Sequence, residues 1–476
     1  MNLKSHLTHP VFELIRKTAD RRQTEAFVVG GFVRDLLLGR PSPDLDCVVK
    51  GNGIELCREL CAEIGKRTGE TPVLHEFGQF GTCKFEYDGL EMEFVGARKE
   101  TYKPGSRKPV VEEGTMEEDR MRRDFSINAM AVSLNKASFG ELSDPFNGLE
   151  DLRNQLVRSH RDPDLSFEED PLRMLRAIRF ASQLFFDIEA GTFAAIMRQK
   201  EHIGELSAER VTEELDKIIL SPKPSYGFKL LDAAGLLEII FPELCRLKGV
   251  EKRNGKAHKD NFEHTLEVLD HVAYAKGGLW LRWAALLHDI AKPKTKRFEE
   301  PRGWTFHGHE FVGAKMVPGI FRRFKLPMDE NMQFVKKMVE LHLRPIILAE
   351  DIVTDSAVRR LLFEAGEDIG SLMTLAKADI TSKNREKVQR YRNNFAIVER
   401  KLEELEEKDR IRNFQPPVSG NDIMEYFNIP PCEEIGIIKT RIKDAILDGI
   451  IENDRGQAWE LMIETGKGLG LSCPRS

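Results

Sequence analysis

The sequence has no surplus of positive charge, because 72 lysines and arginines stand against 78 aspartates and glutamates in 476 residues. A net charge of −6 is not typical of a nucleic-acid-binding protein, so contact with a nucleic acid would require basic residues that are concentrated locally. The sequence also lacks a signal peptide and a long apolar run. We therefore expect neither export nor membrane insertion.

Cysteines are few and follow no pairing pattern. The seven cysteines are scattered from Cys47 to Cys473 without a Cys-x-x-Cys pair. This predicts reduced thiols in a cytoplasmic protein, not a disulfide framework. Internal repeats and low-complexity tracts are missing as well, and the length is too great for one hydrophobic core, which predicts three or four domains.

Strand-forming sequence is confined to the first part of the chain. Beyond about Val157, apolar residues recur at every third or fourth position almost throughout, with breaks at residues 221–224, Pro293 and residues 415–417. The pattern predicts an α+β protein with a small head on a large all-helical body. Residues Tyr102 to Glu118 show no periodicity, which predicts a mobile loop.

A glycine pair and two aspartates stand close together in Phe27 to Val49 (FVVGGFVRDLLLGRPSPDLDCVV). The glycines favour close approach of a phosphate, and the following helix would carry Arg34 toward it. Asp44 and Asp46 lie two residues apart before an apolar run, so a strand would place both carboxylates on one face, where they suit Mg²⁺. Either half alone is weak evidence, because an isolated Asp-x-Asp is usually a polar turn.

This segment resembles motif A of the class II nucleotidyltransferases, the family of CCA-adding enzymes and bacterial poly(A) polymerases. The resemblance implies a polymerase-β-like head in which Asp44 and Asp46 are catalytic and hold the Mg²⁺ ions that align the 3′-hydroxyl of an RNA with a nucleoside triphosphate. Gly31 and Arg34 would contact the triphosphate. A hairpin turn is expected just before the strand that carries Glu93, a candidate third catalytic carboxylate whose alternative is an exposed strand residue.

Two further segments match the family between the head and the neck. Arg122 to Met130 (RRDFSINAM) resembles motif B, with serine for the usual threonine, and implies that Arg123 binds the nucleotide. Asp144 to Gly148, together with Asp151, resembles motif C, which implies a hinge. Each would be an ordinary charged turn if it stood alone.

Glu169 to Arg173 (EDPLR) resembles motif D, and Arg176 and Arg179 follow it on the expected helix as further nucleotide-binding candidates. Asp170 and Arg173 are three residues apart, so they would project together. A carboxylate acceptor beside a guanidinium donor matches the edges of cytosine and adenine and rejects uracil and guanine. The alternative is a salt bridge on a helix surface.

A second set of polar residues lies in the helical body and resembles the HD-domain phosphohydrolases. Histidines and aspartates from separate helices would close around one or two divalent transition metals. The alternative is a structural body in which these histidines are core residues. The candidate ligands are His264, His288, Asp289, His309, His342 and Asp379.

Two C-terminal segments are candidates for RNA contact. Lys383 to Arg392 has five basic residues against one acidic residue and includes Tyr391, although a solvated helix face explains it equally well. Gly420 to Arg455 resembles the C-terminal segment of HD-containing CCA-adding enzymes, with Pro431-Cys432 in place of the usual Pro-Gly.

Together these patterns predict a head at 1–157, a neck at 158–245, an HD domain at 246–400 and an RNA-binding tail at 401–476. The resemblance implies a cytoplasmic enzyme that adds C and A to the 3′ end of tRNA from CTP and ATP by two-metal transfer, together with a candidate phosphohydrolase activity in the HD domain. The alternatives are a poly(A) polymerase and an HD-type phosphohydrolase with a non-catalytic head.

Overall fold

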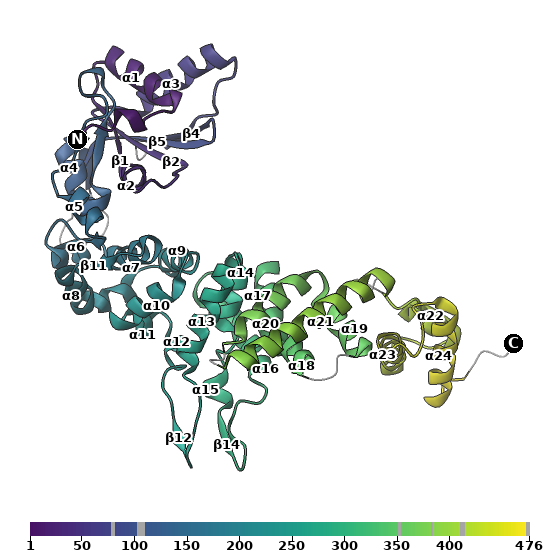
Figure 1. Cartoon of the computed structure of the whole chain (residues 1–476). Helices are drawn as coiled ribbons and strands as arrows, with labels where there is room; N and C mark the ends of the chain where they lie inside the picture. The colour runs from purple at the N-terminus through teal and green to yellow at the C-terminus, as the bar shows by residue number, and fades with distance from the viewer. Residues whose placement is uncertain (78–80, 102–109, 351–353, 382–383, 410–414, 473–476) are drawn as a thin grey trace. The chain divides into compact units, whose positions relative to one another are not determined.

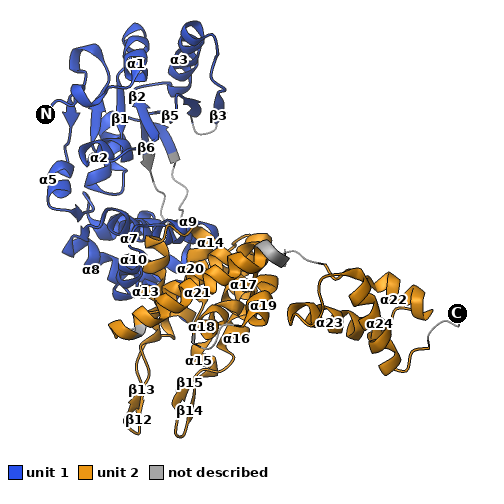
Figure 2. Cartoon of the chain, turned by 45° about the vertical axis from the view of Figure 1, so that its right-hand side comes forward, with its two compact units in different colours: residues 1–242 blue, residues 243–476 orange. Residues whose placement is uncertain are grey.

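The structure is a computed structural model that describes residues 1–77, 81–101, 110–350, 354–381, 384–409 and 415–472. The chain divides into two compact units, residues 1–242 and residues 243–476 (Figure 2). Within the described residues, no helix is both long and apolar enough to cross a membrane.

The head in the first unit is built on a seven-stranded sheet with the order β3-β4-β5-β2-β1-β8-β9. The central pair β2 and β5 is parallel, and the other neighbouring pairs are antiparallel. The strands are β1 (Ala26–Val29), β2 (Asp44–Val49), β3 (His75–Phe77), β4 (Thr82–Tyr87), β5 (Leu90–Gly96), β8 (Ala131–Ser133) and β9 (Leu142–Ser143).

Side-chain alternation gives this sheet one buried face and one polar face. Leu45, Cys47, Phe85 and Phe94 are buried on the side covered by α1 (Pro10–Arg21) and α3 (Gly53–Thr68), which lie side by side in Figure 1. The predicted hairpin is confirmed, because β4 and β5 pair directly across a two-residue turn, Asp88-Gly89, with positive φ at both residues.

The rest of the first unit consists of short connecting elements followed by the neck helices. The connecting elements are α2 (Gly31–Leu37), β6 (Arg98–Thr101), β7 (Val110–Glu113), α4 (Met116–Met121), η3 (Ser126–Asn128), α5 (Gly148–Arg153) and β10 (Leu156–Val157). The neck has α6 (Pro163–Glu169), α7 (Leu172–Leu184), β11 (Asp187–Ile188), α8 (Ala190–Gln199), α9 (Ala208–Ile219), α10 (Pro224–Ala233) and α11 (Leu236–Ile240). After these, α12 (Pro242–Cys245) begins at the last residue of the first unit.

The second unit is mainly helical. Its body consists of α13 (Asn261–Tyr274), α14 (Leu279–Leu287), α15 (Lys292–Thr295), α16 (His309–Arg323), α17 (Glu330–Leu341), α18 (Leu343–Glu350), α19 (Asp355–Ala365), α20 (Ile369–Asp379) and α21 (Arg385–Asp409). Its tail consists of α22 (Gly420–Phe427), α23 (Glu433–Leu447) and α24 (Arg455–Gly468). The predicted α+β class, a nucleotidyltransferase-like head with a helical body, is confirmed.

Three details of the expectation need correction. The body is not purely helical, because it carries the hairpin β12 (Lys252–Arg253) with β13 (Lys256–Ala257) and the hairpin β14 (Arg297–Glu299) with β15 (Gly303–Thr305). Strands of two or three residues are too short to show a period. The expected mobile loop Tyr102 to Glu118 falls partly on residues 102–109, outside the described residues, and its later part forms β7 and α4.

The third correction concerns the cysteines. Cys57 on α3 and Cys83 on β4 are joined by a disulfide, so the prediction of reduced thiols is wrong for this pair. They are 26 residues apart, and only the packing of α3 on the sheet brings them together. Spacing along the sequence cannot reveal such a pair. Within the described residues, Cys47, Cys61, Cys245 and Cys432 form no disulfide.

Candidate active site and metal centre

A cavity of about 570 Å³ in the first unit collects most of the residues predicted for nucleotide transfer. It is lined by Gly30, Gly31, Arg34, Asp44, Asp46, Arg122, Arg123, Asp124, Asn128, Asp170, Arg173, Arg176, Arg179 and Phe180. Segments matching motifs A, B and D therefore meet at one place, although they are far apart in the sequence. Of the residues predicted for the head reaction, Glu93 is the one that does not line this cavity.

The carboxylates lie on the polar face of the sheet. Asp44 and Asp46 are two residues apart on β2, and Asp46 is paired in register with Glu93 on the parallel strand β5. Burial, reinforced by the nearby charge of Glu93, raises the pKa of Asp46. Closely spaced carboxylates are a fitting donor set for a divalent cation, because the cation offsets their mutual repulsion.

Glu93 is held by a residue that the sequence patterns did not single out. Its Oε2 lies 2.9 Å from Nζ of Lys84 on β4. Lys84 is the register partner of Glu93, so both side chains are on the same face of the sheet. The lysine fixes the position of the glutamate beside Asp46 and balances part of the negative charge there.

The glycine turn gives the backbone close access to the cavity. Gly30 has a φ of +71°, and a Cβ there would lie 3.1 Å from a guanidinium nitrogen of Arg123. Arg34, on the short helix α2, is 9% exposed and donates to Asn128 Oδ1 at 2.8 Å. Its guanidinium is therefore positioned at the cavity wall before any ligand is bound.

Asp124 is a residue of this site that sequence reasoning missed. It is buried, and it accepts hydrogen bonds from Arg176 Nε at 2.7 Å and Asn128 Nδ2 at 3.0 Å. Burial alone would raise the pKa of its carboxyl, but the charge of Arg176 and these hydrogen bonds lower it to about 2. The available signal was the position of Asp124 inside the motif B match, directly after Arg122 and Arg123.

Three arginines surround one aromatic ring at the cavity. The guanidinium carbons of Arg179, Arg34 and Arg176 lie 4.1, 5.1 and 5.4 Å from the centre of the Phe180 ring. The ring face stabilises nearby cations and keeps their planes oriented. Glu214 on α9 forms an ion pair with Arg179 at 3.2 Å, so part of this positive charge is neutralised within the neck.

Asp170 and Arg173, the two residues predicted to read the base, both line the cavity, but only Arg173 lies on α7. Asp170 precedes α7 in an extended conformation, because α7 begins only after Pro171. Its carboxylate lies 3.1 Å from Arg210 Nη2, whereas Arg173 donates to Ser166 Oγ at 2.9 Å and to the Arg122 carbonyl at 2.8 Å. Arg173 also forms an ion pair with Glu169 at 3.2 Å. Within the described residues, Asp170 and Arg173 therefore pair with other residues and not with each other.

The segment matching motif C connects the head to the neck through hydrogen bonds. Asp144 accepts from the backbone N–H groups of Gly148 and Leu149 at 2.7 and 2.8 Å, which fixes the start of α5. Asp151 accepts from the Ser126 hydroxyl and from Arg158 Nε. Ser126 stands where the family usually has threonine, and its hydroxyl forms this hydrogen bond to Asp151.

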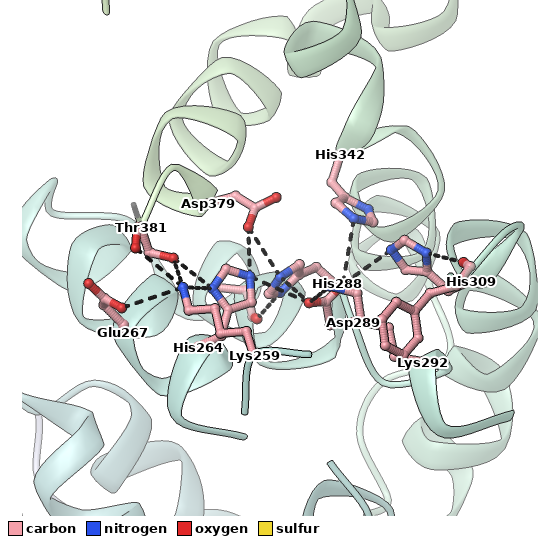
Figure 3. A network of polar contacts seen from close by, with 12 residues as sticks. Lys259, His264, Glu267, His288, Asp289, Lys292, His309, His342, Asp379 and Thr381 are labelled. Atoms are coloured by element: carbon pink, nitrogen blue, oxygen red, sulfur yellow. Dashed lines mark hydrogen bonds and ion pairs between the residues drawn. The ribbon is translucent and has the colours of Figure 1, made fainter. Parts of the chain in front are cut away.

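All six predicted ligands come together in the second unit (Figure 3). His264, His288 and Asp379 form one group, and Asp289, His309 and His342 form the other. Asp289 lies between the groups, with its Oδ2 3.3 Å from His288 Nε2 and its Oδ1 3.2 Å from His309 Nε2. Four separate helices or helix ends contribute the histidines, as the sequence predicted.

The imidazoles of this cluster have the orientation that metal binding requires. The Nδ1 atoms of His288, His309 and His342 lie 2.7 to 2.8 Å from the carbonyl oxygens of Ala285, Phe306 and Val339. Each Nδ1 therefore carries the proton, and each Nε2 offers a lone pair to the centre. Within the described residues, these three buried Nε2 atoms have no hydrogen-bond partner, which fits a divalent metal.

Two lysines near this cluster were not expected from the sequence. Lys292 Nζ lies 2.5 Å from Asp289 Oδ2, and Lys259 Nζ lies 3.1 Å from His264 Nδ1 (Figure 3). Burial lowers the pKa of His342 to about 3, so this ligand is neutral at ordinary pH. The donor set implies dependence on a divalent metal.

The chain matches three family models in the same order as these features. The Poly A polymerase head domain covers residues 26–158, the probable RNA and SrmB- binding site of polymerase A covers residues 185–247, and the HD domain covers residues 261–384. The A-adding tRNA nucleotidyltransferase of Deinococcus radiodurans is 32% identical over 431 residues, covering 88% of this chain and 91% of that protein. The chain belongs to the tRNA nucleotidyltransferase family.

Other tRNA nucleotidyltransferases extend this comparison. The CC-adding tRNA nucleotidyltransferase of Thermus thermophilus is 32% identical, with 89% of this chain and 90% of that protein covered. The match to the A-adding enzyme of Aquifex aeolicus, also 32% identical, covers 68% of this chain and only 38% of the relative. A solved CCA-adding enzyme in an apo form shares the fold, with a TM-score of 0.62, 22% identity and 98% and 97% of the two chains covered.

The C-terminal candidates for RNA contact are only partly in the described structure. Lys383 lies outside the described residues, and Tyr391 on α21 is buried, so its ring packs inside the body. Cys432 precedes α23 in an extended conformation that any residue can adopt, so this position does not require glycine.

Proposed function

We propose that the chain adds C and A nucleotides to the 3′ end of tRNA from CTP and ATP without a nucleic-acid template. The observation that carries the proposal is the single cavity in which Asp44 and Asp46 face the arginines of the neck. Mg²⁺ held by Asp44 and Asp46, with Glu93 beside them, would activate the attacking hydroxyl and neutralise the leaving pyrophosphate.

The chain's own residues account for the remaining steps. Gly31, Arg34 and Arg123 bind the triphosphate at the turn, with Arg34 held in place by Asn128. Asp170 and Arg173 present an acceptor and a donor to the base, and Arg176 and Arg179 supply positive charge beside them. An incoming uracil or guanine would leave these polar groups unpaired, which disfavours both bases.

The test uses tRNA lacking its 3′ end and tRNA ending in CC, each incubated with Mg²⁺ and one labelled triphosphate at a time. We expect C to be added to the first RNA and A to the second, with no use of UTP or GTP. Long A tracts on unrelated RNA would indicate a poly(A) polymerase instead. No incorporation on either RNA would indicate a non-catalytic head.

The six-ligand cluster supports a second activity, hydrolysis of phosphate esters in the HD domain. Its buried, lone-pair-bearing Nε2 atoms are the specific observation that favours a transition-metal site over core histidines. Such a metal would acidify a water molecule. The test is hydrolysis of 2′,3′-cyclic AMP by the full chain with Mn²⁺, Ni²⁺, Co²⁺ or Mg²⁺, and failure with all four would refute this activity.

A further inference from the structure

The two hairpins of the body form a basic surface in a protein that is acidic overall. Residues 248–259 and 292–302, which contain or border these hairpins, carry ten lysines and arginines against three glutamates, a local charge of +7. The net charge of the whole chain is −6. Such a concentration of charge is the pattern that a nucleic-acid backbone selects, and it arises from residues that the motif comparisons do not use.

The hairpins lie side by side and hold each other (Figures 1 and 2). The guanidinium of Arg253 lies 4.7 Å from the centre of the Phe298 ring, and Asn254 donates to Glu300 at 2.7 Å. Lys256 donates to the carbonyl of Pro301. These contacts make one double hairpin, defined here as residues 252–257 with 297–305.

Several charges of this region are not used in holding it together. Lys252, Lys294, Arg297 and Arg302 are exposed, and among the described residues none of the four forms an ion pair. Exposed cations without acidic partners repel one another, so their clustering is stabilised when an anion binds. The phosphates of a flexible single strand can reach several such cations at once.

Aromatic side chains link the double hairpin to the metal cluster. The His258 ring contacts the rings of Trp304 and Phe306, with centroids 5.6 and 5.9 Å apart. Lys292 lies over the Phe306 ring at 5.6 Å and reaches Asp289 at 2.5 Å. Rings interleaved with cations are the elements that stack bases and contact phosphates in single-stranded RNA.

We propose that the double hairpin binds the phosphate backbone of single-stranded RNA and guides its 3′ end to the metal cluster. The substrate of this site is then a phosphate at the end of an RNA chain and not a free nucleotide. The inference rests on the proposed phosphohydrolase activity and names its substrate class.

The reaction on a 2′,3′-cyclic end is hydrolytic and needs no further reactant. The oxygen of water bonds to phosphorus while one of the two ribose P–O bonds breaks. The departing ribose oxygen takes up a proton from the water, which leaves a phosphomonoester on the RNA. Lys292 lies beside Asp289 in a position to contact the phosphate oxygens as they approach the cluster.

The experiment compares two substrates in the full metal-loaded chain, 2′,3′-cyclic AMP and a short RNA with a 2′,3′-cyclic end. The double variant Lys252→Glu with Arg302→Glu should raise KM for the RNA about tenfold at low salt and leave KM for cyclic AMP unchanged, because only the RNA reaches the hairpin. The matched control is Lys315→Glu with Arg322→Glu, two exposed cations on α16. It should change neither value.

A second readout does not depend on catalysis. In chelator, the variant should bind the same RNA more weakly than the parent. Its slope of log affinity against log salt should be smaller by about 1.4, since each phosphate contact to a single strand contributes about 0.7. Equal losses in the α16 control would overturn the inference, and so would an unchanged KM for the RNA.

Three further outcomes separate this inference from the functions it rests on. Hydrolysis of cyclic AMP but not of the RNA end overturns the inference alone, whereas no hydrolysis of either substrate with any divalent metal refutes the phosphohydrolase proposal. If the hairpin variant loses CCA addition to the same extent as RNA hydrolysis, the double hairpin serves the body of the tRNA and not the metal cluster, which also overturns the inference.

Discussion

The buried Asp124 of the head forms an ion pair with Arg176 of α7, whose Nε donates to its carboxylate at 2.7 Å. Asn128 donates to the same carboxylate, and Arg34 donates to Asn128. The segments that match motifs A and B are therefore linked by one chain of hydrogen bonds to α7, the helix that begins within the motif D match. Removal of any one of these side chains should disturb the remaining hydrogen bonds, because a polar group is left without its partner.

The pairing of Asp124 with Arg176 makes the free energy of unfolding depend on pH. The pKa of Asp124 is about 2, below the 3.8 of the unpaired side chain, so its contribution is full above about pH 4 and is lost as the pH falls toward 2. Between pH 5 and pH 2 the parent should lose about 2 kcal/mol more unfolding free energy than Asp124→Asn. Denaturant unfolding at several pH values measures this, and Glu70→Gln, an exposed carboxylate, should follow the parent.

Asp44→Ala and Asp46→Ala should each abolish nucleotide transfer while tRNA binding stays within a few-fold of the parent. The reason is that these carboxylates act on metal and triphosphate and not on the RNA body. Single-turnover addition measures the rate of transfer and filter binding measures the affinity for tRNA, with Glu70→Ala as the control. Transfer above about a tenth of the parent rate in either variant would contradict the metal assignment.

Asp170→Ala and Arg173→Ala should erase discrimination between C or A and U or G as well as slow the transfer. Each change removes one half of the pair that reads the base edge. The ratio of kcat/KM for CTP and UTP measures the effect. A variant that is slow but as selective as the parent would exclude base reading by that residue.

Arg210 offers a sharper version of the same test, because it contacts Asp170 without lining the cavity. We expect Arg210→Ala to lower selectivity by freeing the Asp170 carboxylate, with a smaller loss of rate than Asp170→Ala shows. Arg198→Ala removes an exposed ion pair with Asp164 on the same neck and serves as the control. If the parent, Arg210→Ala and Arg198→Ala all show the same selectivity, the role of Arg210 is purely structural.

His288→Ala should stop hydrolysis of a 2′,3′-cyclic phosphate and leave addition of C and A intact, since the two reactions use different residues in different units. Chelation followed by Mg²⁺ alone should restore addition only, because imidazole ligands favour a transition metal whereas the carboxylates of β2 favour Mg²⁺. Metal analysis and both assays on one preparation decide this. Loss of addition in a folded His288→Ala variant would show that the two activities depend on each other.

The sequence by itself determined the family, the α+β class, the helical body and most of the polar residues that meet in the two sites. It could do so because turns, metal pairs and base-reading pairs depend on residue type at short spacing, as in Asp44 with Asp46. The same locality set the hairpin at Asp88-Gly89.

Only the tertiary structure decided which residues support these groups. Asp124 with Arg176, Lys84 with Glu93 and Arg210 with Asp170 are pairs between separate elements. The disulfide between Cys57 and Cys83 and the double hairpin arise in the same way, from packing between separate segments. Contacts of this kind depend on how helices and strands pack, and a pattern along the chain carries no record of that packing.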